Sequence, residues 1–77
     1  MIYSKLNNIF CNFFNNNEIV INENTSAADI DGWDSLSHIQ LMVIIEKEFN
    51  IKFTTYHIVN MYCVGDLVKY LDELTNS

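Results

Sequence analysis

The chain has 77 residues, about the length of one small domain, and a formal net charge of −6. With four lysines and no arginine it lacks the basic patch that binding to nucleic-acid phosphates requires, so we expect a basic protein as partner and no nucleic acid. Hydrophobic residues make up 49% of the sequence, which favours a folded core. The chain is too short for a deep catalytic pocket with its supporting shells, so an enzyme is not expected.

The same composition predicts a cytoplasmic protein. Cys11 and Cys63 are far apart and outside any Cys-x-x-Cys pattern, so we expect reduced thiols and no disulfide. Residues 1–14 contain Lys5 and several asparagines and lack the small-residue cleavage site of a secretory signal. No apolar run approaches the ~18 residues of a transmembrane helix, so no membrane span is expected.

The first predicted helix covers residues 2–14. Apolar side chains recur there at the spacing of a helix with a wide apolar stripe, namely Ile2, Leu6, Ile9, Phe10, Phe13 and Phe14. Asn15 and the two asparagines after it end this helix, because asparagine competes for local backbone hydrogen bonds. Residues 15–34 form a long connection, with Ile19 and Ile21 as anchors in the core. Connections of this length without secondary structure are often functional.

The second predicted helix covers residues 35–49. Asp34 is placed to cap its N-terminus, where an acidic side chain also suits the helix dipole. Asn50 follows the last apolar residue, as a helix stop does. The side chains expected to face the core are those at helical spacing, namely Ile39, Leu41, Met42, Ile45 and Phe49.

A short helix is predicted over residues 54–61 and a last helix over residues 64–74. Ile51 and Phe53 precede the short helix and are expected to return towards the core. The inward side chains of the last helix are predicted to be Val64, Leu67, Val68, Leu71 and Leu74. Strict alternation of apolar and polar residues is nearly absent. The expected fold class is therefore all-α: a small antiparallel bundle of three long helices and one short helix, forming one domain over residues 1–77.

Two segments carry a resemblance to a known family. They are GWDSLSHIQLMVIIEKEFNIKF, from Gly32 to Phe53, and VGDLVKYL, from Val64 to Leu71. The triplet Asp-Ser-Leu alone is common, but here it is followed by a correctly phased helix, a Glu-Phe end, an Ile-x-Phe return and a last helix. In this order the chain resembles the acyl carrier protein family over nearly its whole length.

The resemblance implies a role for Ser35. In acyl carrier proteins the serine of this triplet is esterified with 4'-phosphopantetheine from coenzyme A, whose thiol carries an acyl group as a thioester. Ser35 is the matching residue, and a helix N-terminus suits a phosphodiester anion. The implied partners are a phosphopantetheinyl transferase, an acyl- or aminoacyl-loading ligase and acyl-transfer enzymes. We expect a monomer without catalysis of its own.

The second helix is expected to dock these partners. Leu36 and Val43, with Gln40 between them, fall on the face away from the core, where an exposed apolar pair indicates a contact patch. The full expected docking set is Asp34, Leu36, Gln40, Val43, Glu46 and Lys47. Fatty-acid carriers usually have acids where this chain has Ser37, Gln40 and Lys47. The resemblance therefore implies a specialised biosynthetic pathway, because each lost charge pair weakens docking to enzymes that recognise an acidic helix.

Other interpretations stay open from the sequence. An aminoacyl or D-alanyl carrier loaded by an adenylating enzyme would have the same helices, and a helical interaction module would need no reactive serine. A small hydrolase built on Ser35 and His38 lacks a third group and the Gly-x-Ser-x-Gly turn. A calcium loop around Asp29 fails, because Ala27 occupies a position where the EF-hand pattern needs an oxygen ligand. No metal site is expected.

Overall fold

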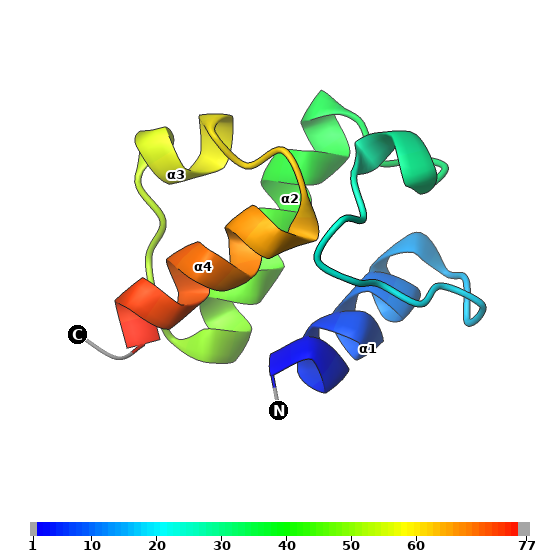
Figure 1. Cartoon of the computed structure of the whole chain (residues 1–77), viewed down its shortest axis with the longest axis horizontal. Helices are drawn as coiled ribbons and strands as arrows, with labels where there is room; N and C mark the ends of the chain where they lie inside the picture. The colour runs from blue at the N-terminus through cyan, green and yellow to red at the C-terminus, as the bar shows by residue number, and fades with distance from the viewer. Residues whose placement is uncertain (1, 76–77) are drawn as a thin grey trace.

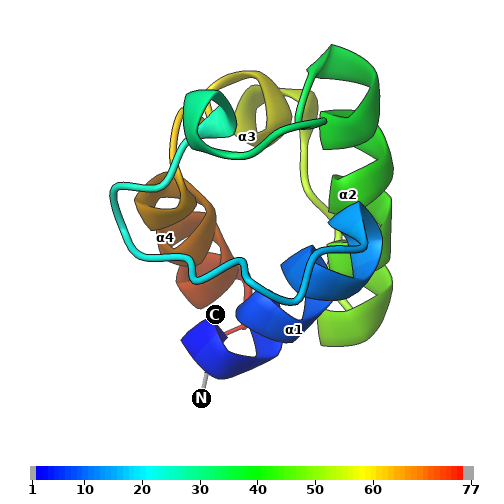
Figure 2. The same cartoon turned by 90° about the vertical axis from the view of Figure 1, so that its right-hand side faces the viewer.

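The computed structural model describes residues 2–75. Its elements are α1 (Ile2–Phe14), the 3₁₀ helix η1 (Ala27–Asp29), α2 (Ser35–Phe49), α3 (Thr55–Val59) and α4 (Val64–Thr75), and no strand occurs in this range. The all-α prediction, with three long helices and one short one, is confirmed. Figures 1 and 2 show α1 running against α2, while α4 follows the general direction of α2 and α3 lies near the end where α2 begins.

Two asparagines end the long helices by adopting a left-handed conformation. Asn50 follows α2 with φ of 54°, and Asn15 follows α1 with φ of 52°. Asparagine tolerates this region better than most residues, so it ends a helix in much the same way as glycine. The stop signals predicted at these positions therefore work through backbone conformation.

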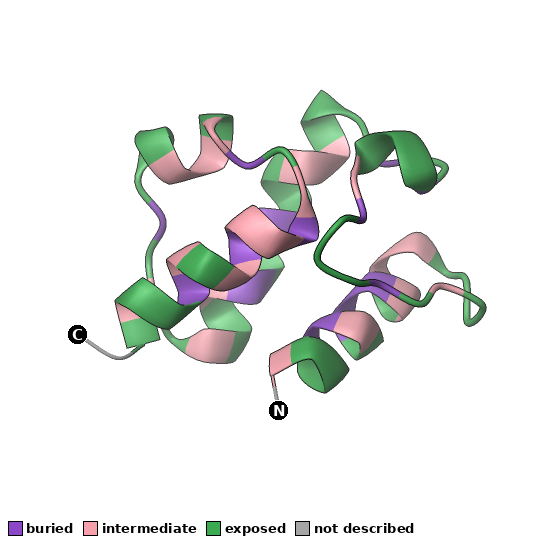
Figure 3. Cartoon of the chain, in the orientation of Figure 1, coloured by how far each residue is buried: buried purple, intermediate pink, exposed green. Residues whose placement is uncertain are grey.

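The core lies between the three long helices, each of which carries buried residues (Figure 3). The large side chains that are fully buried come from α1, α2 and α4 in similar numbers: Leu6, Phe10, Leu41, Met42, Ile45, Val64, Leu67 and Leu71. Ile21, Trp33 and Phe53 extend this core from the connecting segments. Burial of apolar surface is the main favourable term in folding, so these contacts hold α2 in place behind the candidate site.

The prediction that Ile39 faces the core is wrong. Its side chain is 54% exposed, whereas Leu41, Met42 and Ile45 are fully buried. Each i+3 step falls about 60° short of a full turn, because an α-helix rotates about 100° per residue. Two such steps separate Ile39 from Ile45, which places Ile39 at the edge of the buried stripe and next to α3.

The long connection between α1 and α2 is hydrogen-bonded to α1 and to the start of α4. The Asn7 side chain accepts a hydrogen bond from Ile21 N at 2.7 Å and donates one to Ile19 O at 3.0 Å. Further along, Thr25 O accepts from Val64 N at 2.8 Å, and Glu23 O accepts from Gly65 N at 2.9 Å. These bonds tie the connection to α1 and to the start of α4, which fixes the direction in which the chain enters α2.

The connection also holds secondary structure that the sequence analysis did not predict. The 3₁₀ helix η1 spans Ala27–Asp29, and the Asp29 carboxylate accepts from Ser26 N at 2.9 Å. The Ser-x-x-acid spacing is a capping pattern and could have indicated it. The short helix α3 ends at Val59, earlier than predicted, and Asn60 is its C-terminal cap. Tyr56 O accepts from both the backbone N–H of Asn60 at 3.1 Å and its side-chain amide at 2.9 Å.

Candidate functional site

The start of α2 places two serines in opposite situations. Ser37 Oγ accepts a hydrogen bond from Asp34 N at 2.8 Å and donates one to Gly32 O at 2.7 Å. Ser35, the first residue of α2, is exposed, and within residues 2–75 nothing hydrogen-bonds to its hydroxyl. Ser37 therefore builds the helix start, whereas Ser35 presents an unengaged hydroxyl to solvent.

The turn before α2 positions its capping groups. Gly32 has φ of 91°, a conformation that other residues rarely adopt, and it directs its carbonyl towards Ser37. Asp34 caps the helix as predicted, with Oδ1 accepting from Ser37 N at 2.9 Å. This hydrogen bond, with a further contribution from the Ser37 side chain, holds the pKa of Asp34 below its usual value. The residue before Ser35 is therefore a carboxylate at neutral pH.

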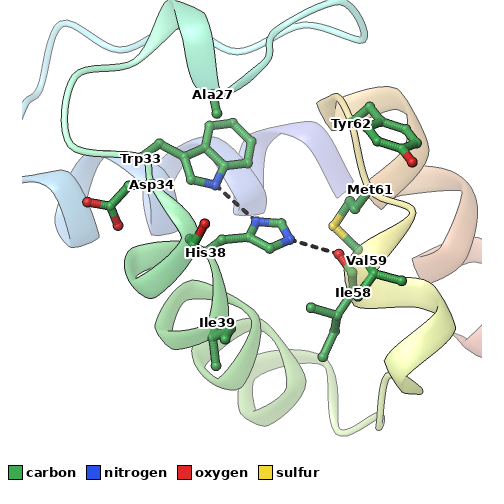
Figure 4. A pocket seen from close by; sticks show the side chains of 10 residues that line it. Ala27, Trp33, Asp34, His38, Ile39, Ile58, Val59, Met61 and Tyr62 are labelled. Carbon is green, nitrogen blue, oxygen red and sulfur yellow. Dashed lines mark hydrogen bonds between the residues drawn. The ribbon is translucent and has the colours of Figure 1, made fainter.

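A groove of about 520 Å³ lies between α2 and α3 (Figure 4), and Ser35 is one of the residues that line it. Trp33 and His38 line it on the side of α2, and Ile58 lines it on the side of α3. Its other lining residues are mostly apolar, namely Ala27, Asp34, Ile39, Val59, Met61 and Tyr62. The unengaged hydroxyl thus lies at the edge of an apolar groove.

A hydrogen-bonded bridge crosses this groove. Trp33 Nε1 donates to His38 Nδ1 at 3.0 Å, and His38 Nε2 lies 3.1 Å from Ile58 O (Figure 4). Both ring nitrogens of His38 are engaged, so the imidazole has no nitrogen left to accept a proton from Ser35. The Ser35–His38 pair therefore does not form a nucleophile and base.

Four of the predicted docking residues share one exposed face of α2. Leu36 is 68% exposed and Val43 is 44% exposed, as predicted, and Gln40 and Lys47 are exposed as well. At about 100° per residue these four side chains fall within an arc of about 60°. The structure thus brings these four residues together on one face of α2, and Asp34 lies at the N-terminal end of the helix.

Glu46 does not belong to this face. Its side chain is half-buried, and Oε2 accepts a hydrogen bond from Phe53 N at 2.7 Å. At about 100° per residue it lies roughly 100° from Lys47 around the helix. One carboxylate oxygen of Glu46 therefore stabilises the fold, because it binds the segment that returns from α2 towards α3.

Two other kinds of feature, a metal-binding cluster and a membrane-spanning helix, are not found among residues 2–75. Between residues 2 and 75, no three His, Cys, Asp or Glu side chains cluster in a way that could hold a metal ion. In the same range, no helix is both long enough and apolar enough to cross a membrane. The chemistry available at the start of α2 is therefore that of one exposed hydroxyl beside a carboxylate and an apolar groove.

Comparison with known sequences gives two bacterial relatives of similar length. An acyl carrier protein of Thermotoga maritima is 29% identical, over 94% of this chain and 89% of the relative. An acyl carrier protein of Caulobacter vibrioides is 34% identical over 55 residues, which are 71% of this chain and 70% of the relative. No model of a known protein family matches the chain.

Comparison with solved structures agrees in fold and in sequence. The solution NMR structure of a holo acyl carrier protein from Geobacter metallireducens superposes with a TM-score of 0.90 and is 39% identical, over 96% of this chain and 85% of that chain. The likeness thus covers all the helices and the connection that leads to Ser35. The chain belongs to the acyl carrier protein family.

Proposed function

We propose that this protein carries acyl groups as thioesters on a 4'-phosphopantetheine arm attached to Ser35. The observation that supports the attachment point is the Ser35 hydroxyl, which is exposed at the start of α2 and makes no hydrogen bond within the described residues. Members of the family are carriers and not catalysts, and one similar solved structure is of a holo protein. When bound, the arm supplies the thiol that holds the acyl group.

The residues around Ser35 fit such a group. Ser35 begins a 15-residue helix, and the N–H groups of a helix N-terminus favour a phosphodiester anion. Ser37 and Asp34 satisfy each other's backbone N–H groups, so the helix start stays ordered without using Ser35. Asp34 would repel the anion, so we assign it a second role as a contact for a basic transferase.

Intact mass measurement tests the attachment. After incubation with coenzyme A and a broad-specificity phosphopantetheinyl transferase, the wild-type protein should gain the mass of one phosphopantetheine. Ser35→Ala should gain nothing and keep its helical circular dichroism. Ser4→Ala, which changes an exposed serine on α1, is the matched control and should be modified like the wild type. An unmodified wild type, or a modified Ser35→Ala, would contradict the proposal.

We further propose that the partners belong to a specialised biosynthetic pathway and not to fatty-acid elongation. The support is the charge of the exposed face of α2, where Gln40 and Lys47 lie beside Leu36 and Val43 and carry no negative charge. Ser37 adds little to this difference, because its side chain is turned into the helix cap. An enzyme that steers towards a dense acidic helix gains few charge pairs here.

Turnover by a ketoacyl synthase of fatty-acid elongation tests this second proposal. The holo protein should be a poor substrate, and Lys47→Glu should raise the turnover about two- to fivefold, the range expected for one surface charge pair. Lys52→Glu makes the same change in net charge outside α2, at an exposed residue, and should leave the turnover unchanged. Efficient turnover of the wild type, or an equal gain in both variants, would overturn the proposal.

A further inference from the structure

The bridge between α2 and α3 is held at both ends by groups that cannot easily move. Trp33 is 7% exposed, and its ring packs edge-on against Phe10 with ring centroids 5.3 Å apart. Its indole N–H donates to His38 Nδ1 at 3.0 Å, and the opposite ring nitrogen of His38 lies 3.1 Å from the backbone oxygen of Ile58 in α3. The imidazole therefore connects the core-facing side of α2 to α3.

These partners determine the state of the imidazole. An indole N–H can only donate, and a carbonyl oxygen can only accept. His38 Nδ1 is therefore the acceptor, and the hydrogen is on Nε2, which donates to Ile58 O. The ring is neutral and uses both nitrogens, so any displacement of His38 breaks one or both hydrogen bonds.

The bridge crosses the groove that Ser35 also lines. Trp33, His38 and Ile58 all line this groove, and in Figure 4 the imidazole spans the space between the indole and the α3 backbone. An alkyl chain that enters from Ser35 and passes deep between α2 and α3 has to separate His38 from one of its partners. The partner left behind would be a polar group without a hydrogen bond on an apolar surface, which is costly.

We propose that the Trp33–His38–Ile58 bridge is a latch that closes this groove to long alkyl chains, which makes His38 a specificity-determining residue. The inference rests on the proposed attachment at Ser35, because the arm brings its cargo to the mouth of the groove. With the latch closed, a short acyl group and the beginning of a longer one lie outside the space between α2 and α3. The latch thus favours short acyl groups, which do not have to be buried between α2 and α3.

The first test uses the unmodified protein and 1-decanol as the alkyl probe. Trp33 is the only tryptophan of the chain, so its fluorescence reports the bridge directly. The wild type should show no saturable change in this fluorescence. His38→Ala should bind decanol at least about tenfold more tightly, the factor expected for one lost hydrogen bond. His38→Gln can still accept from Trp33 and donate to Ile58, and should behave like the wild type.

Two results of this titration would overturn the latch. One is saturable binding of decanol by the wild type with the affinity of His38→Ala, and the other is the absence of binding in all three proteins. If His38→Ala does not fold by circular dichroism, Trp33→Phe replaces it, because this change removes the indole donor and keeps one aromatic ring in the core. Because this variant lacks the tryptophan, its binding of decanol is monitored by NMR through the backbone amide of Val59, which lines the groove. The chemical shift of this amide should change when decanol is added.

The second test separates the latch from the attachment. Butanoyl and decanoyl thioesters are loaded on the arm, and their rates of hydrolysis are compared. In the wild type the two should hydrolyse at similar rates, whereas His38→Ala should protect only the decanoyl group, by about tenfold. A purely structural role would not produce this dependence on chain length. If no arm attaches, the proposed function fails while the decanol titration still decides the latch; a protected decanoyl group in the wild type refutes the latch alone.

Discussion

The starts of α2 and α4 solve the same problem in different ways. The first N–H groups of a helix lack partners within the helix. At α2 these groups are served by nearby side chains, with Asp34 and Ser37 capping each other. At α4 they are served by the distant backbone, with Thr25 O accepting from Val64 N and Glu23 O accepting from Gly65 N.

This difference decides which helix start can receive a large group. Side-chain capping leaves the first residue of α2 exposed, whereas at α4 the connection covers the helix start and Val64 is fully buried. A Cβ atom on Gly65 would lie 2.9 Å from Glu23 O, so there is no room even for a methyl group. The helix start capped by its own side chains is the open one, and the one capped by the backbone is closed.

The largest effect on stability is expected for Gly65→Ala. The new methyl group would meet the backbone oxygen of Glu23, which cannot move without breaking the hydrogen bond from Gly65 N. We expect a loss of about 1–3 kcal/mol from such overpacking, partly offset by the higher helix propensity of alanine. Urea unfolding measures it. Ser35→Ala, at the open start, should stay within about 0.5 kcal/mol of the wild type, and equal stability of both variants would contradict the comparison.

The second-largest effect on stability is expected for Ser37→Ala. The hydroxyl accepts from Asp34 N and donates to Gly32 O. Its removal therefore leaves both of these backbone groups without this hydrogen bond. Both groups are close to solvent, and we expect a loss of about 1 kcal/mol in the free energy of unfolding. Ser35→Ala is again the control, two residues away on the same helix. A Ser37→Ala variant as stable as Ser35→Ala would show that the two hydroxyls do not differ as described.

Local signals predicted the parts of this comparison that depend on neighbouring residues. The cap at Asp34, the stop at Asn50 and the exposure of Leu36 and Val43 follow from residue type and helical spacing. Ser35 as a site followed from the family resemblance. The attachment itself stays a prediction.

Contacts between distant segments were not predictable in this way. The bridge joins residues 20 apart in the sequence, and it exists only because α3 is folded against α2. The bond from Phe53 N to Glu46 likewise depends on the path of the return segment. Ile39 was assigned to the core because regular spacing cannot say where the buried stripe is centred. That position depends on which helices pack on either side.

The capping of α2 by Asp34 should make the stability of the folded chain depend on pH. The hydrogen bond from Ser37 N holds the pKa of Asp34 below its usual value of 3.8, so the ionised carboxylate stabilises the folded chain. This contribution is present above the usual value and is lost as the pH falls through the lowered one. The difference in melting temperature between the wild type and Asp34→Asn should therefore shrink in that acidic range. Asp31→Asn removes a nearby charge outside the cap, and an identical pH profile for it would contradict this explanation.

The smallest effect on stability is expected from changing the salt concentration. Between Leu6 and Glu46 the chain has six acids and no lysine or arginine, namely Glu18, Glu23, Asp29, Asp31, Asp34 and Glu46. Repulsion between surface charges about 10 Å apart is screened at about 0.1 M ionic strength. The melting temperature should rise slightly in sodium chloride, and further in magnesium chloride of equal ionic strength. A melting temperature indifferent to both salts would mean that these acids do not repel one another measurably.

The location of the arm tests the central claim most directly. The wild type is treated with coenzyme A and a phosphopantetheinyl transferase, digested, and fragmented in a mass spectrometer to find the residue that carries the added mass. The open start of α2 predicts that the whole of the added mass is on Ser35 and none is on Ser37, although the two hydroxyls lie within one turn of the same helix. Added mass on Ser37, or on any residue at the start of α4, would contradict the account.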